Sequence, residues 1–235
     1  MPGSSLWLLP PPTHPLHTRL NSLITSLLPT YLPQESSSSP DVVPHYFAAH
    51  VTLTSNIPPS LYGSDPQGWL ERAFAIKATE LAKEVYPRVR FEKVDTQDVF
   101  FRRCFIRVGF EGVRNLAGLA RAVGVHDEGD SVERNGEGGV KFGGETEKWL
   151  GEWREAFGPH VSLMYGDVPI SEENLEQVAR VVREAGVKLA GNQGRTDGDR
   201  EGEGLDGWEG GVVWLVPTDR PIAEWRPIAT WTIPS

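Results

Sequence analysis

The sequence predicts an α+β fold in which two pseudo-symmetric lobes, each a mainly antiparallel sheet with flanking helices, face a shared central cleft. Two observations predict it. The strand-like pattern H-V-T-L at His50 recurs in the later half of the chain as H-V-S-L at His160. Strands and helices also follow in similar order in the two halves, with hairpins among strand–helix units. We therefore expect a single two-lobed domain over residues 1–235.

The first part of the chain predicts a strand, a helix and a loop. Residues 5–10, S-L-W-L-L-P, are typical of a short strand. After Pro15, apolar residues at helical spacing predict an amphipathic helix that ends near Pro29. The serine-rich residues 33–44 predict a loop that leads into the His50 strand. The apolar stripe of the helix consists of Leu16, Leu20, Leu23, Ile24, Leu27 and Leu28.

The next segments predict a helix and a hairpin. Residues 67–86 carry apolar side chains on one helical face, and Pro87 ends the pattern. Residues 88–95 and 98–109 are rich in β-branched and aromatic residues, and only T-Q separates them. They predict two strands of one hairpin.

Two further helices precede the His160 strand, a short one at about 113–123 and a Trp-rich one at about 146–157. The residues between them, about 127–145, are acidic, rich in glycine and without periodicity. We expect a mobile surface loop there, because the segment offers few apolar side chains to pack.

The last part of the chain predicts one helix, a second loop and two closing strands. Ser171 is a favourable N-cap, and Gly186 ends the helix. A second mobile Gly-rich acidic loop is expected at about 191–210. Residues 212–218 and 225–233 then predict the closing strands.

Composition favours a globular protein without disulfides. The chain has 235 residues, 39% of them hydrophobic, and a single cysteine, Cys104, which can form no internal disulfide. No apolar run approaches the ~20 residues that span a bilayer, and the N-terminal residues lack the pattern of a signal peptide. We expect a cytoplasmic protein, with peripheral association with internal membranes left open.

The net charge of −9 argues against a long nucleic acid as partner, because such binding generally needs a basic face. A small anion in a local pocket is compatible with this charge. We expect a small substrate and a monomeric protein.

The repeated motif combines a chemical face with a core face. Side chains alternate along a strand, so His50, Thr52 and Thr54 share one face while Val51 and Leu53 share the other. A single such motif is compatible with an ordinary half-exposed strand histidine. The second copy, in which His160 and Ser162 share a face with Val161 and Leu163 opposite, favours a functional pair.

Other candidates are weaker. The Gly clusters lack the strand, helix and lysine context of a phosphate-binding loop. Pro15 separates His14 from His17, and no carboxylate or cysteine completes a ligand set, so we expect no metal site. His45 and His126 lie in predicted loops, where a solvated histidine is the ordinary case.

Arg102 and Arg103 are adjacent on a predicted strand, so only one of them can face the cleft. A solvated or ion-paired arginine is the favoured interpretation.

Two imidazoles across a cleft can divide acid–base work, because one accepts a proton from water while the other donates a proton to a leaving oxygen. A hydroxyl two residues along the same strand face, about 6.6 Å away, can hold a phosphate oxygen between the rings. This chemistry requires no metal and no cofactor. Which histidine is acid and which is base stays open.

H-V-T-L-T at His50 and H-V-S-L-M-Y-G-D at His160 resemble the two signature motifs of the 2H phosphoesterase superfamily. The layout is similar to its 2',3'-cyclic-nucleotide 3'-phosphodiesterase branch, known from fungi and plants. The opening S-L-W-L-L-P-P-P and the segment F-F-R-R-C also resemble that branch, less specifically. The chain departs from plant members in lacking their cysteine pairs and in its acidic insertion between the motifs.

The resemblance implies roles for five residues. His50 and His160 would be the catalytic pair, Thr52 and Ser162 the hydroxyls that hold the phosphate, and Tyr165 a further residue that contacts the substrate. The implied reaction opens a 2',3'-cyclic phosphate to a 2'-phosphate. The branch also converts ADP-ribose 1'',2''-cyclic phosphate, a by-product of tRNA splicing, to ADP-ribose 1''-phosphate.

Two alternatives stay open at this point. One is another 2H activity on RNA ends, such as 2'-5' ligation or trimming of 3' ends, which a basic groove beside the cleft would favour. The other is a protein that binds a nucleotide without turnover. Intact histidines and hydroxyls in both motifs argue against the second, because pure binding needs no acid–base pair.

Overall fold

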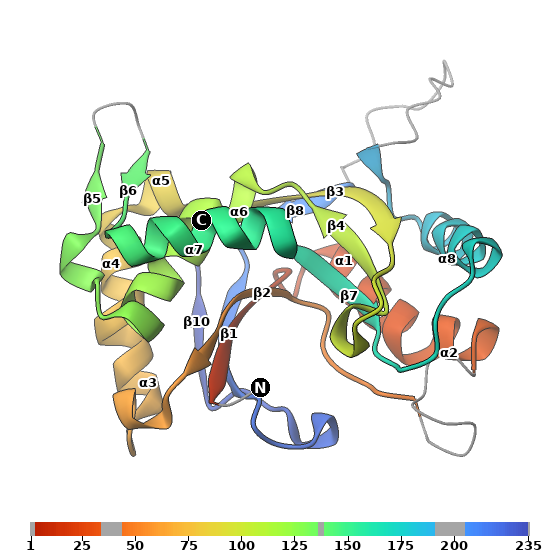
Figure 1. Ribbon diagram of the computed structural model, residues 1–235, viewed down its shortest axis with the longest axis horizontal. Helices are drawn as coiled ribbons and strands as arrows, with labels where there is room; N and C mark the ends of the chain where they lie inside the picture. The colour runs from red at the N-terminus through yellow and green to blue at the C-terminus, as the bar shows by residue number, and fades with distance from the viewer. Residues whose placement is uncertain (1–2, 34–43, 136–138, 191–204, 235) are drawn as a thin grey trace.

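The computed structural model describes residues 3–33, 44–135, 139–190 and 205–234. Eight strands form one curled sheet in the order β10-β9-β1-β2-β7-β4-β3-β8, and all neighbours are antiparallel (Figure 1). With helices around it, the sheet confirms the predicted α+β class. Its strands are β1 (Ser4–Leu9), β2 (Val51–Ile57), β3 (Arg88–Asp95), β4 (Cys104–Val108), β7 (His160–Met164), β8 (Gly207–Glu209), β9 (Val212–Pro217) and β10 (Ala229–Thr232).

The two motif strands are neighbours at the centre of this sheet. β2 and β7 pair at Val51 and Val161, the residues that directly follow the two histidines. The predicted pair of sheets is therefore one continuous sheet of two four-stranded halves. Each half also mixes early and late parts of the chain, because β9 and β10 pair beside β1 while β3 and β4 pair beside β7. Long-range strand pairing of this kind leaves no local signal in the sequence.

The core face of the motif strands is buried as predicted. Val51, Leu53 and Val161 are fully buried, and Leu163 is 1% exposed. The opposite faces of β2 and β7 are thereby fixed toward a cavity, because a strand cannot slip by one residue without exposing its apolar set.

Helices cover the sheet on several sides (Figure 1). In this view α6 and α7 cross above the sheet, α3 and α4 lie on the left beside β10, and α1, α2 and α8 lie on the right. No helix within the described ranges is both long enough and apolar enough to cross a membrane. The helices are α1 (Pro15–Ser22), α2 (Leu28–Tyr31), α3 (Pro66–Trp69), α4 (Ile76–Glu80), α5 (Ala82–Val85), α6 (Glu111–Arg121), α7 (Gly144–Ala156) and α8 (Glu172–Glu184).

Two of the helices differ in detail from the sequence prediction. The first runs through a π-helical stretch, Leu23–Leu27, and reaches Tyr31 instead of ending near Pro29. The wider π turn in front of the proline accommodates a residue that has no N–H to donate. The second is broken into α3, a π-helical stretch over Leu70–Ala75, α4 and α5.

The predicted hairpin strand over residues 98–109 is also shorter than expected. Phe100–Arg102 form a 3₁₀ turn, and β4 begins only at Cys104. Local hydrogen bonds compete with the strand here, since the Thr96 hydroxyl donates to the carbonyl of Arg103. Arg102 therefore lies in this turn instead of in a strand.

The first Gly-rich segment packs more apolar surface than its composition suggests. Its described residues include the strands β5 (Glu133–Arg134) and β6 (Val140–Lys141), and three of its apolar side chains are buried: Val132, Val140 and Phe142. A Cβ added at Gly118 of α6 would lie 2.5 Å from the Phe142 ring, so this glycine permits the contact. Of the second predicted loop, residues 191–204 lie outside the described residues, and residues 207–209 form β8.

Candidate active site

A cavity of about 400 Å³ lies between the two motif strands and α7. All five residues singled out from the sequence line it, and they come from the residue before β2, from β2 and β7, and from the residue that follows β7. Aromatic side chains from β1, α7 and the residues after β9 supply much of the remaining wall. The five are His50, Thr52, His160, Ser162 and Tyr165.

A hydrogen bond to the nearby backbone orients the ring of His50. Its Nδ1 lies 2.6 Å from the carbonyl oxygen of Ala48, and its ring stacks on Trp7 at a centroid distance of 3.7 Å. Because a carbonyl only accepts, Nδ1 carries the proton and donates it. The unprotonated Nε2 is then left for chemistry in the cavity.

The ring of His160 is oriented in the same way, but here the backbone partner is a glycine. Its Nδ1 lies 3.1 Å from the carbonyl oxygen of Gly158, again two residues earlier. Gly158 has a φ of +59°, a conformation that favours glycine. Both imidazoles therefore place the same nitrogen, Nε2, on the side away from their carbonyl partner.

Burial lowers the pKa of each histidine to about 4. The hydrogen bond to the backbone carbonyl opposes this effect in both cases. The remaining contributions differ, because His160 lowers the pKa of His50, whereas the charges of Arg102 and Arg107 lower the pKa of His160. At neutral pH the free protein thus holds two neutral rings, and a bound anion would favour protonation of one of them.

The two motif hydroxyls are not equivalent. The Ser162 hydroxyl donates to the carbonyl oxygen of Phe101 at 3.1 Å, whereas no described residue bonds the hydroxyl of Thr52. Tyr165 is buried and stacks on Phe47 at 3.9 Å. Burial raises the pKa of Tyr165, so its phenol stays protonated and can donate.

Arg102 is a cavity residue that the sequence prediction missed. Its side chain is buried, lines the cavity, and stacks with its guanidinium 4.2 Å from the Phe157 ring centre. Arg103 forms an ion pair instead, with its Nη1 2.9 Å from Oδ1 of Asp98. The favoured interpretation thus holds for Arg103 and is wrong for Arg102, although only one of the two lines the cavity, as expected.

Arg121, at the end of α6, and the α7 tryptophans Trp149 and Trp153 also line the cavity. The Trp-rich composition of α7 was visible in the sequence, but nothing local indicated that these rings face the motif strands. His126, expected to be solvated, accepts a hydrogen bond from Nε of Arg121 at 3.1 Å.

Among the described residues, no group of three or more His, Cys, Asp and Glu side chains is placed to hold a metal ion. The one cysteine, Cys104, is buried, and its pKa is raised to about 12 by burial and by the nearby charge of Asp95. It stays a thiol and is a poor nucleophile. The polar groups that line the cavity include two imidazoles, several hydroxyls and two arginines.

Comparison with known proteins identifies the family of the chain. Residues 1–233 match the model of the family described as cyclic phosphodiesterase-like protein. Three fungal relatives are each named 2',3'-cyclic-nucleotide 3'-phosphodiesterase. The protein from Neurospora crassa is 51% identical over 231 residues, covering 97% of this chain and 98% of that protein. The protein from Phaeosphaeria nodorum is 40% identical with the same coverage, and that from Yarrowia lipolytica is 27% identical, covering 95% of this chain and 96% of its own length. The chain belongs to the cyclic phosphodiesterase-like family, as its two histidine motifs predicted.

Proposed function

We propose that this protein hydrolyses 2',3'-cyclic nucleotides to nucleoside 2'-phosphates without a metal ion. The observation that carries the proposal is the matched pair His50 and His160, each fixed through Nδ1 by a backbone carbonyl, at one cavity. The names of the three fungal relatives support the substrate and the 3' ester as the bond that breaks.

In the proposed reaction, one imidazole removes a proton from a water molecule, whose oxygen attacks the cyclic phosphorus. The bond between phosphorus and O3' breaks, and the other imidazole, protonated at Nε2, gives its proton to O3'. The product keeps its phosphate on O2'. Proton exchange with solvent then restores both rings.

The surroundings of the rings suggest which one is the base. Burial lowers the pKa of both rings to about 4, and at His160 the charges of Arg102 and Arg107 add to this effect. The positive charges nearest His50 are fewer, and a bound phosphate adds negative charge between the rings. We assign the base to His160 and the acid to His50.

The motif hydroxyls would stabilise the charge that develops on the phosphate oxygens. Thr52 can donate without losing a described partner. Ser162 must turn away from the carbonyl of Phe101 to do so, while Arg102 adds a fixed positive charge to the same cavity.

ADP-ribose 1'',2''-cyclic phosphate is a finer candidate for the natural substrate, with a place in the processing of tRNA-splicing by-products. It also carries a five-membered cyclic phosphate on a ribose, which joins O1'' and O2'' instead of O2' and O3'. The net charge of −9 makes RNA ends less favourable substrates, because a polymer needs a basic groove. A cytoplasmic monomer stays a prediction, and light scattering after gel filtration tests the oligomeric state.

Incubation with adenosine 2',3'-cyclic phosphate in the presence of EDTA tests the proposal. Full activity in chelator and a 2'-phosphate in the phosphorus NMR spectrum of the product are expected. Activity that requires added zinc or magnesium contradicts the metal-free mechanism. A 3'-phosphate product contradicts the proposed regiochemistry, and binding without turnover favours the nucleotide-binding alternative.

A further inference from the structure

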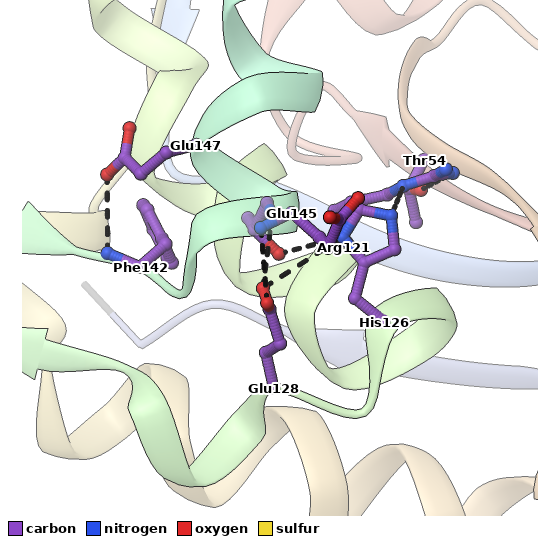
Figure 2. A network of polar contacts seen from close by, with 8 residues as sticks. Thr54, Arg121, His126, Glu128, Phe142, Glu145 and Glu147 are labelled. Carbon is purple, nitrogen blue, oxygen red and sulfur yellow. Dashed lines mark hydrogen bonds and ion pairs between the residues drawn. The ribbon is translucent and has the colours of Figure 1, made fainter.

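Arg121 is held in one orientation at the wall of the catalytic cavity (Figure 2). Its Nε donates to Nε2 of His126 at 3.1 Å, and its Nη1 lies 3.3 Å from the carbonyl oxygen of Ser55 and 3.5 Å from the hydroxyl of Thr54. The guanidinium also lies 4.9 Å from the ring centre of Trp149. Four neighbours, from β2, α7 and the π-helical stretch Ala122–His126 that follows α6, therefore fix this cation.

The charge of Arg121 is not balanced by a carboxylate within ion-pair distance among the described residues. Figure 2 also draws the acids Glu145 and Glu147, and the charges of Glu128 and Glu145 oppose the lowering of the His126 pKa by burial. Glu128 accepts the backbone N–H groups of Glu145 and Thr146 and lies 4.0 Å from His126. The carboxylate of Glu128 thus interacts with the N-terminal end of α7. A half-buried arginine that lines a cavity without such a partner is a favourable site for an anion.

The place where Arg121 contacts β2 indicates which part of a substrate this arginine meets. Thr54, its contact, follows Thr52 on the same strand face, about 6.6 Å further from His50. Thr52 is the residue proposed to hold the reacting phosphate. One step of this length is comparable to the distance across a ribose from its cyclic phosphate to its 5' oxygen.

We propose that Arg121 binds a second phosphate group, carried on the 5' oxygen of the same ribose that bears the cyclic phosphate. This inference rests on the proposed function, because it takes the cyclic phosphate to lie between His50 and His160. Arg121 then determines specificity, favouring nucleotides with a 5'-phosphate or 5'-diphosphate over nucleosides that carry only the cyclic phosphate.

Calorimetric titration with two product-like ligands tests the inference without relying on turnover. Adenosine 2'-phosphate and adenosine 2',5'-bisphosphate are compared on the native protein and on Arg121→Gln. The native protein should bind the bisphosphate about tenfold more tightly, in line with one charge-assisted hydrogen-bonding group. Arg121→Gln should lose this preference and bind adenosine 2'-phosphate as the native protein does.

Arg180→Gln serves as the control, since it removes the same charge from an exposed position on α8. It should keep the preference, and Arg121→Lys should keep part of it. Equal weakening of both ligands in Arg121→Gln, with a lower Tm, would show that Arg121 only ties α6 to β2. An unchanged preference, or no preference in the native protein, overturns the inference as well.

Turnover of adenosine 2',3'-cyclic phosphate, measured alongside, separates the two proposals. Its absence in the native protein contradicts the proposed function, whereas the ratio of the two binding constants still decides the role of Arg121.

Discussion

The motif strands β2 and β7 present the same imidazole geometry in different surroundings. On both strands the histidine Nδ1 donates to a carbonyl two residues earlier, and burial lowers the pKa to about 4. His50, however, stacks on the neutral indole of Trp7, whereas Arg102 and Arg107 act on His160. The repeat thus supplies two equivalent rings, and the neighbouring elements make them different.

The hydroxyls of the two strands differ in the same way. Thr52 has no described partner, while Ser162 is bonded to the backbone of the 3₁₀ turn that carries Arg102. In both respects, the residues of β7 have more polar and charged neighbours than those of β2. The surroundings of a duplicated motif can therefore separate the roles of two histidines whose own backbone hydrogen bonds are the same.

The largest expected effect is loss of either ring. His50→Ala and His160→Ala should each lower kcat by about a thousandfold or more, and the double variant should be little worse than either single one, because each proton transfer depends on the other. Steady-state kinetics measure this. His17→Ala, which removes a histidine of α1 outside the cavity, should change kcat little. Multiplying effects in the double variant would show that the rings act independently.

The second effect concerns stability. The pKa of each histidine is about 4 when folded and near 6.5 when unfolded, so the unfolded chain binds more protons between these values. The free energy of unfolding should therefore fall as the pH falls from 6.5 to 4, by up to about 3 kcal/mol for each ring. Urea unfolding at several pH values measures it.

His160→Gln, which cannot titrate, should flatten part of this pH dependence. The histidines outside the cavity contribute equally to both proteins and cancel in the difference, and His50 loses only the charge effect of His160, the smallest contribution to its lowered pKa. An identical pH dependence in the native protein and the variant would mean that His160 is not buried as a neutral ring.

Removal of the hydroxyls should have intermediate effects that separate the strands. Thr52→Ala should lower kcat by about tenfold to a hundredfold with little change in Tm, because its hydroxyl has no described partner. Ser162→Ala should lower kcat less but also lower the free energy of unfolding by about 1 kcal/mol, since the carbonyl of Phe101 loses its donor. The reverse pattern would assign the phosphate contact chiefly to Ser162.

Strand alternation is local and was repeated, so it correctly predicted that His50, Thr52, His160 and Ser162 face one cavity, and the family resemblance added Tyr165. Arg102 was missed because its orientation depends on a 3₁₀ turn that hydrogen bonds from Thr96 help to form within a strand-like segment. Arg121 was missed because its place in the cavity depends on how α6 packs on β2. The pairing of β9 with β1 likewise joins distant parts of the chain. These features come from tertiary contacts, which periodicity does not report.

The smallest expected effect is a shift in the pH dependence of kcat/KM, and it tests most directly which histidine is the base. If His160 is the base, it must be neutral, so kcat/KM should fall at low pH with an apparent pKa well below 6.5. Arg102→Gln removes one positive charge near His160 and should move this acid limb to higher pH, by less than about one unit. Arg102→Lys keeps the charge and should leave the limb in place, even if both variants bind substrate less tightly. A limb that moves equally in both variants would mean that Arg102 acts through packing, and one that persists unchanged in His160→Ala would assign the base to His50.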